Sequence, residues 1–134
     1  MNIYPYAYVL NHYNFVSLRQ QPYVKIQFTK KTYRLVKLLY SIGAIQNYLI
    51  FEKKNTFKKY ILFNATHYKN MPFFKSAQII SRPSKNYTVS YKTLKIINKS
   101  LRQSVVILST AKGLMTHKKA LRHRFGGIII AVLL

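Results

Sequence analysis

The chain has 134 residues, 49% of them hydrophobic, so it is long enough and apolar enough to form the core of one or two small domains. It carries 23 Lys and Arg residues against one acidic residue, Glu52, for a formal net charge of +22. One carboxylate cannot neutralise this charge within the fold, so the composition favours an external polyanion, and nucleic acid is the densest one in cells. A solvated basic surface without a partner and a basic protein at a membrane surface are the alternatives.

The residue types present disfavour most enzymes. No cysteine occurs, which excludes disulfides and thiolate metal sites. Paired carboxylates, a Ser-His-Asp triad and oxygen-ligand sites for magnesium or calcium all need acids that the chain lacks. His12, His67, His117 and His123 could supply a base, and Ser109 a nucleophile, but no acid completes such a site. His117 and His123 are six residues apart on a predicted helix, which fits chance placement better than a shared metal site. We expect no catalytic residues, no cofactor, no metal and no small-molecule substrate.

The longest apolar run without a charge, Phe125–Leu134, is about half a membrane span and indicates a core strand. No Lys or Arg precedes Arg19, unlike a signal peptide or a typical mitochondrial presequence. The bias toward Ile, Lys, Asn, Tyr and Phe is typical of A/T-rich codons. We interpret the chain as the product of an A/T-rich organelle genome, mitochondrial in preference to plastid.

The first half predicts an α-β-α-β-β unit. A helix with a broad aromatic face comes first, although Pro5 restricts its start, and a strand follows in which apolar and polar residues alternate. Thr29 is the predicted cap of the second helix, and Gly43 closes that helix. The expected ranges are a helix over 3–20, a strand over Tyr23–Phe28, a helix over Lys30–Ile42, and strands over Ile45–Phe51 and Tyr60–Phe63 around a turn at residues 53–56.

The polar segment His67–Pro72 is the predicted boundary, giving domains 1–71 and 72–134. The second domain is predicted to be mostly β with one short helix, which makes the chain an α+β protein. The expected ranges are strands over Lys75–Ile80 and Tyr87–Tyr91, a helical turn at Leu94–Asn98, a strand from Ser104 containing Val105–Leu108, a helix over His117–Arg124 ended by Gly126 and Gly127, and a strand over Ile128–Leu134.

A polar turn, Ser109–Gly113, separates the buried strand from the short helix. Its hydroxyls and glycine allow the backbone to approach a ligand closely. Thr116 is a plausible N-cap, yet Lys118 and Lys119 lie in the first turn of the helix, where the macrodipole disfavours cations. That conflict disappears if a phosphate lies there, because helix amides and lysines both attract it.

At these residues the chain resembles the universal small-subunit ribosomal protein eight family, in its bacterial or organellar form. In that family a strand runs into Ser-Thr-x-x-Gly, two aliphatic residues, a Thr, a short basic helix with an Ala, and Gly-Gly. The matching residues are Ser109, Thr110, Gly113, Leu114, Met115, Thr116, Ala120, Gly126 and Gly127. Ser81-Arg82-Pro83 resembles the Ser-Arg/Lys-Pro turn of the family, and Val24–Ile45 matches further upstream around Gly43.

The chain departs from the family pattern at three positions. Ser84 and Ser104 stand where the family usually has Gly, which affects local turn geometry. Ile128 replaces an acidic residue often used within the RNA site, so that contact is not carried over.

The resemblance implies a two-domain protein that binds the central domain of small-subunit rRNA and supports its assembly, with neighbouring small-subunit proteins docking later. The Ser109–Gly113 turn would enter an rRNA minor groove, although its hydroxyls could instead only close the turn. Arg82 would contact the RNA backbone, and Tyr87 would either stack on a base or lie on the sheet surface. The candidate rRNA-binding residues are Arg82, Tyr87, Ser109, Thr110, Lys112, Gly113, Thr116, Lys118, Lys119 and Arg122.

Overall fold

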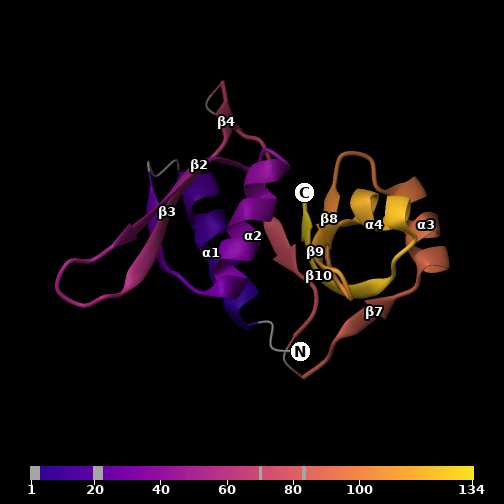
Figure 1. Ribbon diagram of the computed structural model, residues 1–134. Helices are drawn as coiled ribbons and strands as arrows, with labels where there is room; N and C mark the ends of the chain where they lie inside the picture. The colour runs from indigo at the N-terminus through magenta and orange to yellow at the C-terminus, as the bar shows by residue number, and fades with distance from the viewer. Residues whose placement is uncertain (1–3, 20–22, 70, 83) are drawn as a thin grey trace. The chain divides into compact units, whose positions relative to one another are not determined.

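The computed structural model describes residues 4–19, 23–69, 71–82 and 84–134, and it combines helices and strands as the α+β prediction requires (Figure 1). The chain divides into two compact units, the first Pro5–Ser76 and the second containing Ala77–Leu134. The assignment of 1–71 and 72–134 as separate domains stays a prediction.

The first unit confirms the predicted α-β-α-β-β order. Its elements are α1 (Tyr4–Arg19), β1 (Val24–Gln27), α2 (Lys30–Ser41), β2 (Ile45–Glu52) and β3 (Lys59–Ala65). The three strands form an antiparallel sheet in the order β1-β3-β2. Strand β3 is buried on alternate residues, at Ile61, Phe63 and Ala65, so one face of the sheet carries the core.

Helix α2 begins and ends where its sequence predicts. The Thr32 N–H donates to Thr29 Oγ1 over 3.1 Å, and the Thr29 N–H donates to Thr32 Oγ1 over 2.8 Å, which together satisfy two amides at the start of the helix. Leu35, Val36 and Leu39 are buried along one stripe. The next turn is tight because Gly43 adopts a φ of +87°, which glycine tolerates.

The segment predicted as a boundary forms a small hairpin of β4 (His67–Tyr68) and β5 (Met71–Pro72). Two contacts hold it and the residues after it against α1. His67 Nε2 lies 3.2 Å from the Ser17 carbonyl, and the Ser17 hydroxyl donates to the Phe74 carbonyl over 3.0 Å. The hairpin is therefore part of the first unit.

The second unit is built on one antiparallel sheet. Its elements are β6 (Ala77–Ile79), β7 (Tyr87–Val89), α3 (Tyr91–Ser100), β8 (Val105–Thr110), β9 (Gly113–Thr116), α4 (His117–His123) and β10 (Gly127–Leu133). The order is β6-β10-β8-β9, and β7 also pairs with β10. The apolar C-terminal run is thus a strand, as predicted, and Val106, Ile107 and Leu108 of β8 are buried.

Helices α3 and α4 pack against one face of this sheet (Figure 1). The shared core consists of Val89, Leu94, Val106, Leu108, Met115 and Ala120, with Ile97, Leu101, Leu121, Phe125, Ile129 and Val132 packed around it. Burying such apolar side chains stabilises a fold by about 1.5–3 kcal/mol each.

The prediction of a single short helix in the second half is corrected, because α3 has ten residues where only a helical turn was expected. The Ser90 hydroxyl accepts the Thr93 N–H over 3.3 Å and caps the helix, which begins at Tyr91, the last residue of the predicted preceding strand. Leu94 and Ile97 then face the core. Strand β9 was also not predicted as an element of its own.

The predicted helix over His117–Arg124 is confirmed as α4 with its C-cap, but Gly126 and Gly127 do not end it. Arg124 ends the helix by adopting a left-handed conformation, with a φ of +58°, and its N–H donates to the Leu121 carbonyl over 3.3 Å. The glycines instead allow close approach, since a Cβ on Gly126 would lie 2.6 Å from the Val89 carbonyl oxygen. Glycine here serves strand pairing rather than helix termination.

Candidate nucleic-acid interface

The β8–β9 hairpin is closed by Thr110. Its hydroxyl donates to the Gly113 carbonyl over 2.9 Å and accepts the Lys112 N–H over 3.2 Å. Gly113 adopts a φ of +110°, which a residue with a side chain rarely adopts. The Thr110 hydroxyl therefore closes the turn, which was one of the two roles predicted for the hydroxyls of this segment.

Ser109 differs from its neighbour. It pairs with Ile128 on one side and Leu114 on the other, and it is half-buried. Within the described ranges, its hydroxyl has no hydrogen-bond partner. The register aligns Thr88, Ile128, Ser109 and Leu114 across four strands. Because Leu108 and Met115 face the helices, this row lies on the opposite face of the sheet.

The Arg82 turn is held to the same sheet. Arg82 and Lys85 exchange backbone hydrogen bonds of 2.9 and 3.0 Å, and both side chains are exposed. Buried Ser81 fixes the base of the turn, because its hydroxyl donates to the Ile129 carbonyl and accepts the Tyr87 N–H over 3.1 Å. Residue 83, which belongs to the predicted Ser-Arg-Pro motif, lies outside the described residues.

Tyr87 does not share a face with Ser109. It pairs with Ile129, one residue along β10 from the partner of Ser109, so its side chain belongs to the face that the helices cover. The ring is 42% exposed, and Lys85 Nζ lies 5.2 Å from its centroid. The Tyr87 ring is therefore accessible next to the Arg82 turn, on the face of the sheet opposite to the Ser109 hydroxyl.

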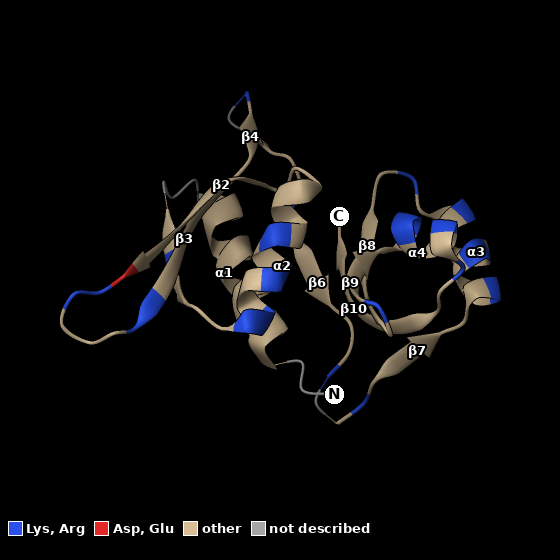
Figure 2. Ribbon diagram, in the orientation of Figure 1, with Lys and Arg blue, Asp and Glu red and all other residues tan. Residues whose placement is uncertain are grey.

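The cations of α4 lie at the surface. Thr116 caps the helix by accepting the Lys119 N–H over 3.4 Å, and Lys118, Lys119 and Arg122 are exposed. Lys112 is exposed in the hairpin turn. Figure 2 shows Lys and Arg distributed over α3, α4 and the β8–β9 turn. The second unit contains no acidic side chain to pair with any of them.

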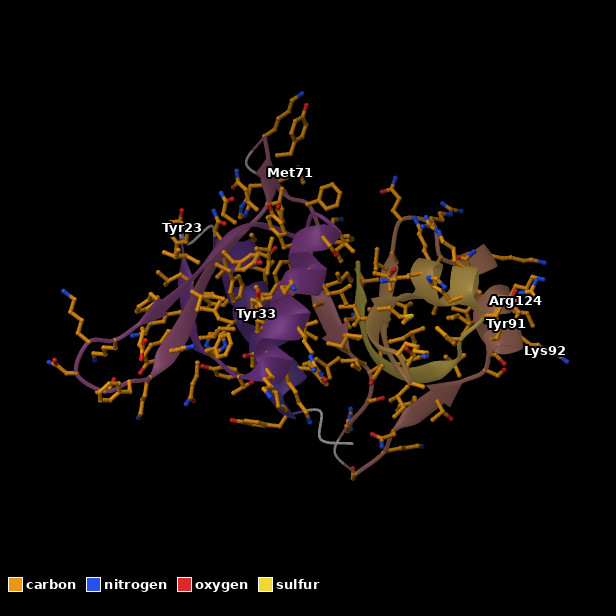
Figure 3. All side chains as sticks on the ribbon, in the orientation of Figure 1. Tyr23, Tyr33, Met71, Tyr91, Lys92 and Arg124 are labelled. Carbon is orange, nitrogen blue, oxygen red and sulfur yellow. The ribbon has the colours of Figure 1, made fainter. Side chains whose placement is uncertain are left out.

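The basic face of α3 was not predicted from the sequence. Lys92, Lys95 and Lys99 are all exposed on this helix, and Ile96 between them is 69% exposed. Figure 3 shows Tyr91, Lys92 and Arg124 among the side chains that project outward from α3 and the end of α4. The signal was present, because lysines spaced three and four apart lie on one face of a helix, but only a helical turn was expected there.

His117 has a structural role. It is buried at the start of α4, and its Nδ1 accepts the Val106 N–H over 3.0 Å. Burial, followed by the positive charge of Lys118, lowers the pKa of His117 below its usual value. A neutral ring can accept this hydrogen bond, which attaches α4 to β8. Nothing in the sequence pattern distinguished this histidine from the other three.

In the part of the chain that the structure describes, no group of three or more His, Asp and Glu side chains could hold a metal ion. None of the helices described is long and apolar enough to cross a membrane.

The α+β fold, the unpaired positive charge and the exposed hairpin turn define a basic protein of the kind that binds polyanions. A family model described as ribosomal protein S8 matches residues 5–134. The chain belongs to this family of small ribosomal subunit proteins, which are structural components of the ribosome and not enzymes.

Relatives come from bacteria and organelles. The small ribosomal subunit protein uS8 of Dictyoglomus thermophilum is 27% identical over 96% of this chain and 95% of its own length. The uS8c protein of Daucus carota is 30% identical over 80% of each chain. The uS8m protein of Acanthamoeba castellanii is 26% identical over 78% of each chain.

The buried His117 predicts a pH-dependent stability. The folded-state pKa lies below the ordinary value of 6.5, so both states are neutral at higher pH. As the pH falls through 6.5, the unfolded chain takes up a proton that the folded chain does not, and the free energy of unfolding decreases by at most about 1.4 kcal/mol per pH unit. Urea denaturation at a series of pH values measures this slope.

His117→Asn retains an acceptor near the position of Nδ1 and does not titrate. We expect this variant to lose most of the dependence on pH in that range, whereas His12→Asn retains it. Equal slopes in the wild type and the His117 variant would contradict the assignment.

Proposed function

We propose that this chain binds the central domain of small-subunit rRNA and supports its assembly, in a mitochondrial ribosome. Membership of the ribosomal protein S8 family supports the first part of this proposal. The observation that carries the site is the β8–β9 hairpin, in which the Ser109 hydroxyl makes no hydrogen bond to the described residues and Lys112 of the same hairpin is exposed.

The hairpin is suited to recognition of RNA by shape. Thr110 and Gly113 hold the turn in one conformation, so the turn loses little conformational entropy when it binds RNA. The Ser109 hydroxyl can donate to or accept from a ribose 2′-hydroxyl or a base edge in a minor groove. Lys112 at the tip contacts a phosphate of the same groove.

The remaining candidate residues position the RNA backbone. Lys118, Lys119 and Arg122 contact phosphates near α4, whose start Thr116 fixes. Arg82 contacts the backbone from its own turn. Tyr87 stacks on an unpaired base beside that turn, on the face of the sheet away from Ser109. Neighbouring small-subunit proteins bind after the rRNA has folded around these contacts.

Removal of the two hydroxyls tests the readout. We expect Ser109→Ala combined with Thr110→Val to weaken binding to a central-domain rRNA fragment by about tenfold, roughly the effect of one lost specific hydrogen bond. Binding to a random RNA of equal length should change little. Ser109→Ala alone should give most of the loss without lowering the melting temperature, because its hydroxyl makes no hydrogen bond within the described fold.

Filter binding measures both affinities, and Ser100→Ala on α3 is the matched control. An equal loss on cognate and random RNA would refute a readout role for the turn.

Salt dependence tests the phosphate contacts. The logarithm of the association constant should fall linearly with the logarithm of salt concentration. Replacing Lys112, Lys118, Lys119 and Arg122 by Gln should reduce that slope by about 3, since each phosphate contact contributes roughly 0.7–0.9.

The control variant replaces the exposed Lys30, Lys31, Arg34 and Lys37 of α2 by Gln and removes the same charge. It should change the slope less. A flat salt response of the wild type, or the same change in both variants, would exclude the proposed phosphate contacts.

The organelle is tested by fractionation. Among the relatives, uS8m and uS8c bear mitochondrial and chloroplast names, which supports an organellar ribosome. The A/T-rich residue bias favours the mitochondrion. We expect the chain to sediment with small ribosomal subunits from purified mitochondria; sedimentation with plastid or cytosolic subunits instead would exclude that placement.

A further inference from the structure

The loop between β2 and β3 carries an aromatic side chain that the fold does not use. Phe57 is 86% exposed, and the loop continues beyond the ends of its two strands (Figure 1). Two backbone hydrogen bonds shape the loop, from the Lys53 N–H to the Lys58 carbonyl over 3.0 Å and from the Thr56 N–H to the Lys53 carbonyl over 3.3 Å. The loop therefore has a defined turn with an apolar ring on its outside.

The backbone at Phe57 is unfavourable. Its φ is +54°, a left-handed conformation that is uncommon for a bulky residue and costs about 1–2 kcal/mol. Gly or Asn would suit this position better. Packing does not account for the ring, since almost all of its surface faces solvent.

The loop is also strongly basic. Lys53, Lys54 and Lys58 are exposed around Phe57, and Lys59 follows at the start of β3. The single acidic residue of the chain, Glu52, pairs in register with Lys59 on the neighbouring strand. A ring surrounded by lysines is the arrangement that binds unpaired nucleotides, since the ring stacks on a base while the ammonium groups contact phosphates.

The same combination extends along the sheet behind the loop. The rings of Phe51 and Tyr60 stack with centroids 5.6 Å apart, and Lys25 Nζ lies 4.8 Å from the centroid of Tyr60. Tyr60 is directly opposite both Phe51 and Gln27 in the sheet. A strand of RNA leaving Phe57 would thus meet further aromatic and cationic groups.

We propose that the loop 53–58 is a second RNA-binding site, which takes an unpaired segment of RNA by stacking a base on Phe57 and contacting phosphates with Lys53, Lys54 and Lys58. This site lies in the first unit, whereas the hairpin and turn described above lie in the second. The inference rests on the proposed rRNA-binding function. RNA is favoured over a membrane surface because Asn55 and Thr56 make the rest of the loop polar, so it offers one ring and no apolar face to insert.

The test uses the full chain and a single-stranded oligouridylate containing 4-thiouridine. We expect Phe57→Ala to weaken its binding by about tenfold, the effect of losing one stacked base, and to abolish the photocrosslink to the peptide that contains residue 57. Binding to an RNA duplex with the same number of phosphates should change little. Phe57→Tyr should retain both affinity and crosslink.

Two further variants separate binding from folding. Phe57→Gly removes the ring and suits the left-handed backbone, so it should lose binding while its melting temperature is unchanged or raised. Phe73→Ala is the matched control, because Phe73 is an aromatic residue of the same unit and is 59% exposed. It should bind the oligonucleotide like the wild type.

Three outcomes would overturn the proposal. Phe57→Ala could behave like Phe73→Ala, the crosslink could map elsewhere, or Phe57 could be needed for binding vesicles of phosphatidylcholine and phosphatidylserine but not for RNA. If a central-domain rRNA fragment still binds with a dependence on Ser109, only this inference fails. If the wild type binds neither RNA, the proposed function fails as well.

Discussion

Strand β10 is the constraint on which the second unit depends. Between Gly127 and Ile129 it pairs with β7 on one side and β8 on the other, and further along it pairs with β6. Such double pairing requires backbones to approach closely at its start, where Gly126 and Gly127 leave no room for a Cβ. The Arg82 turn and the β8–β9 hairpin are far apart in sequence, yet both are attached to this strand.

The register of β10 also decides which candidate residues act together. Ile128 places Ser109 on the face away from the helices, and the next residue, Ile129, places Tyr87 on the other face. Ser109 and Thr110 are likewise adjacent but have different roles, since the hydroxyl of Thr110 closes the turn and that of Ser109 is free for a ligand within the described fold. Consecutive residues of a sequence motif therefore need not contribute to the same contact surface.

The sequence predicted those helices and strands that are determined by residues close together in the chain. The reciprocal hydrogen bonds of Thr29 and Thr32, the alternating strands and the buried run in β8 follow from residue type and spacing. The extent of α3 and the existence of β9 were missed, because both depend on partners distant in sequence. Leu94 and Ile97 need the core that β8 and α4 provide, and β9 is a strand only because β8 lies beside it.

Gly126 and Gly127 were predicted to end α4 because glycine usually ends helices. Arg124 took that role, since Gly126 and Gly127 were needed in the sheet.

The basic residues at the start of α4 link the stability of the fold to the binding of a partner of opposite charge. At the start of α4 three consecutive basic residues meet the positive end of the helix. Burial and the positive charge of Lys118 lower the pKa of His117, which reduces the repulsion there. Lys118 and Lys119 are exposed, and the second unit contains no carboxylate side chain that could approach them. Any anion that binds there stabilises the folded state by mass action and relieves a repulsion that no rearrangement of this chain can remove. The stability of the protein and its binding to a polyanion are therefore coupled through the same few side chains.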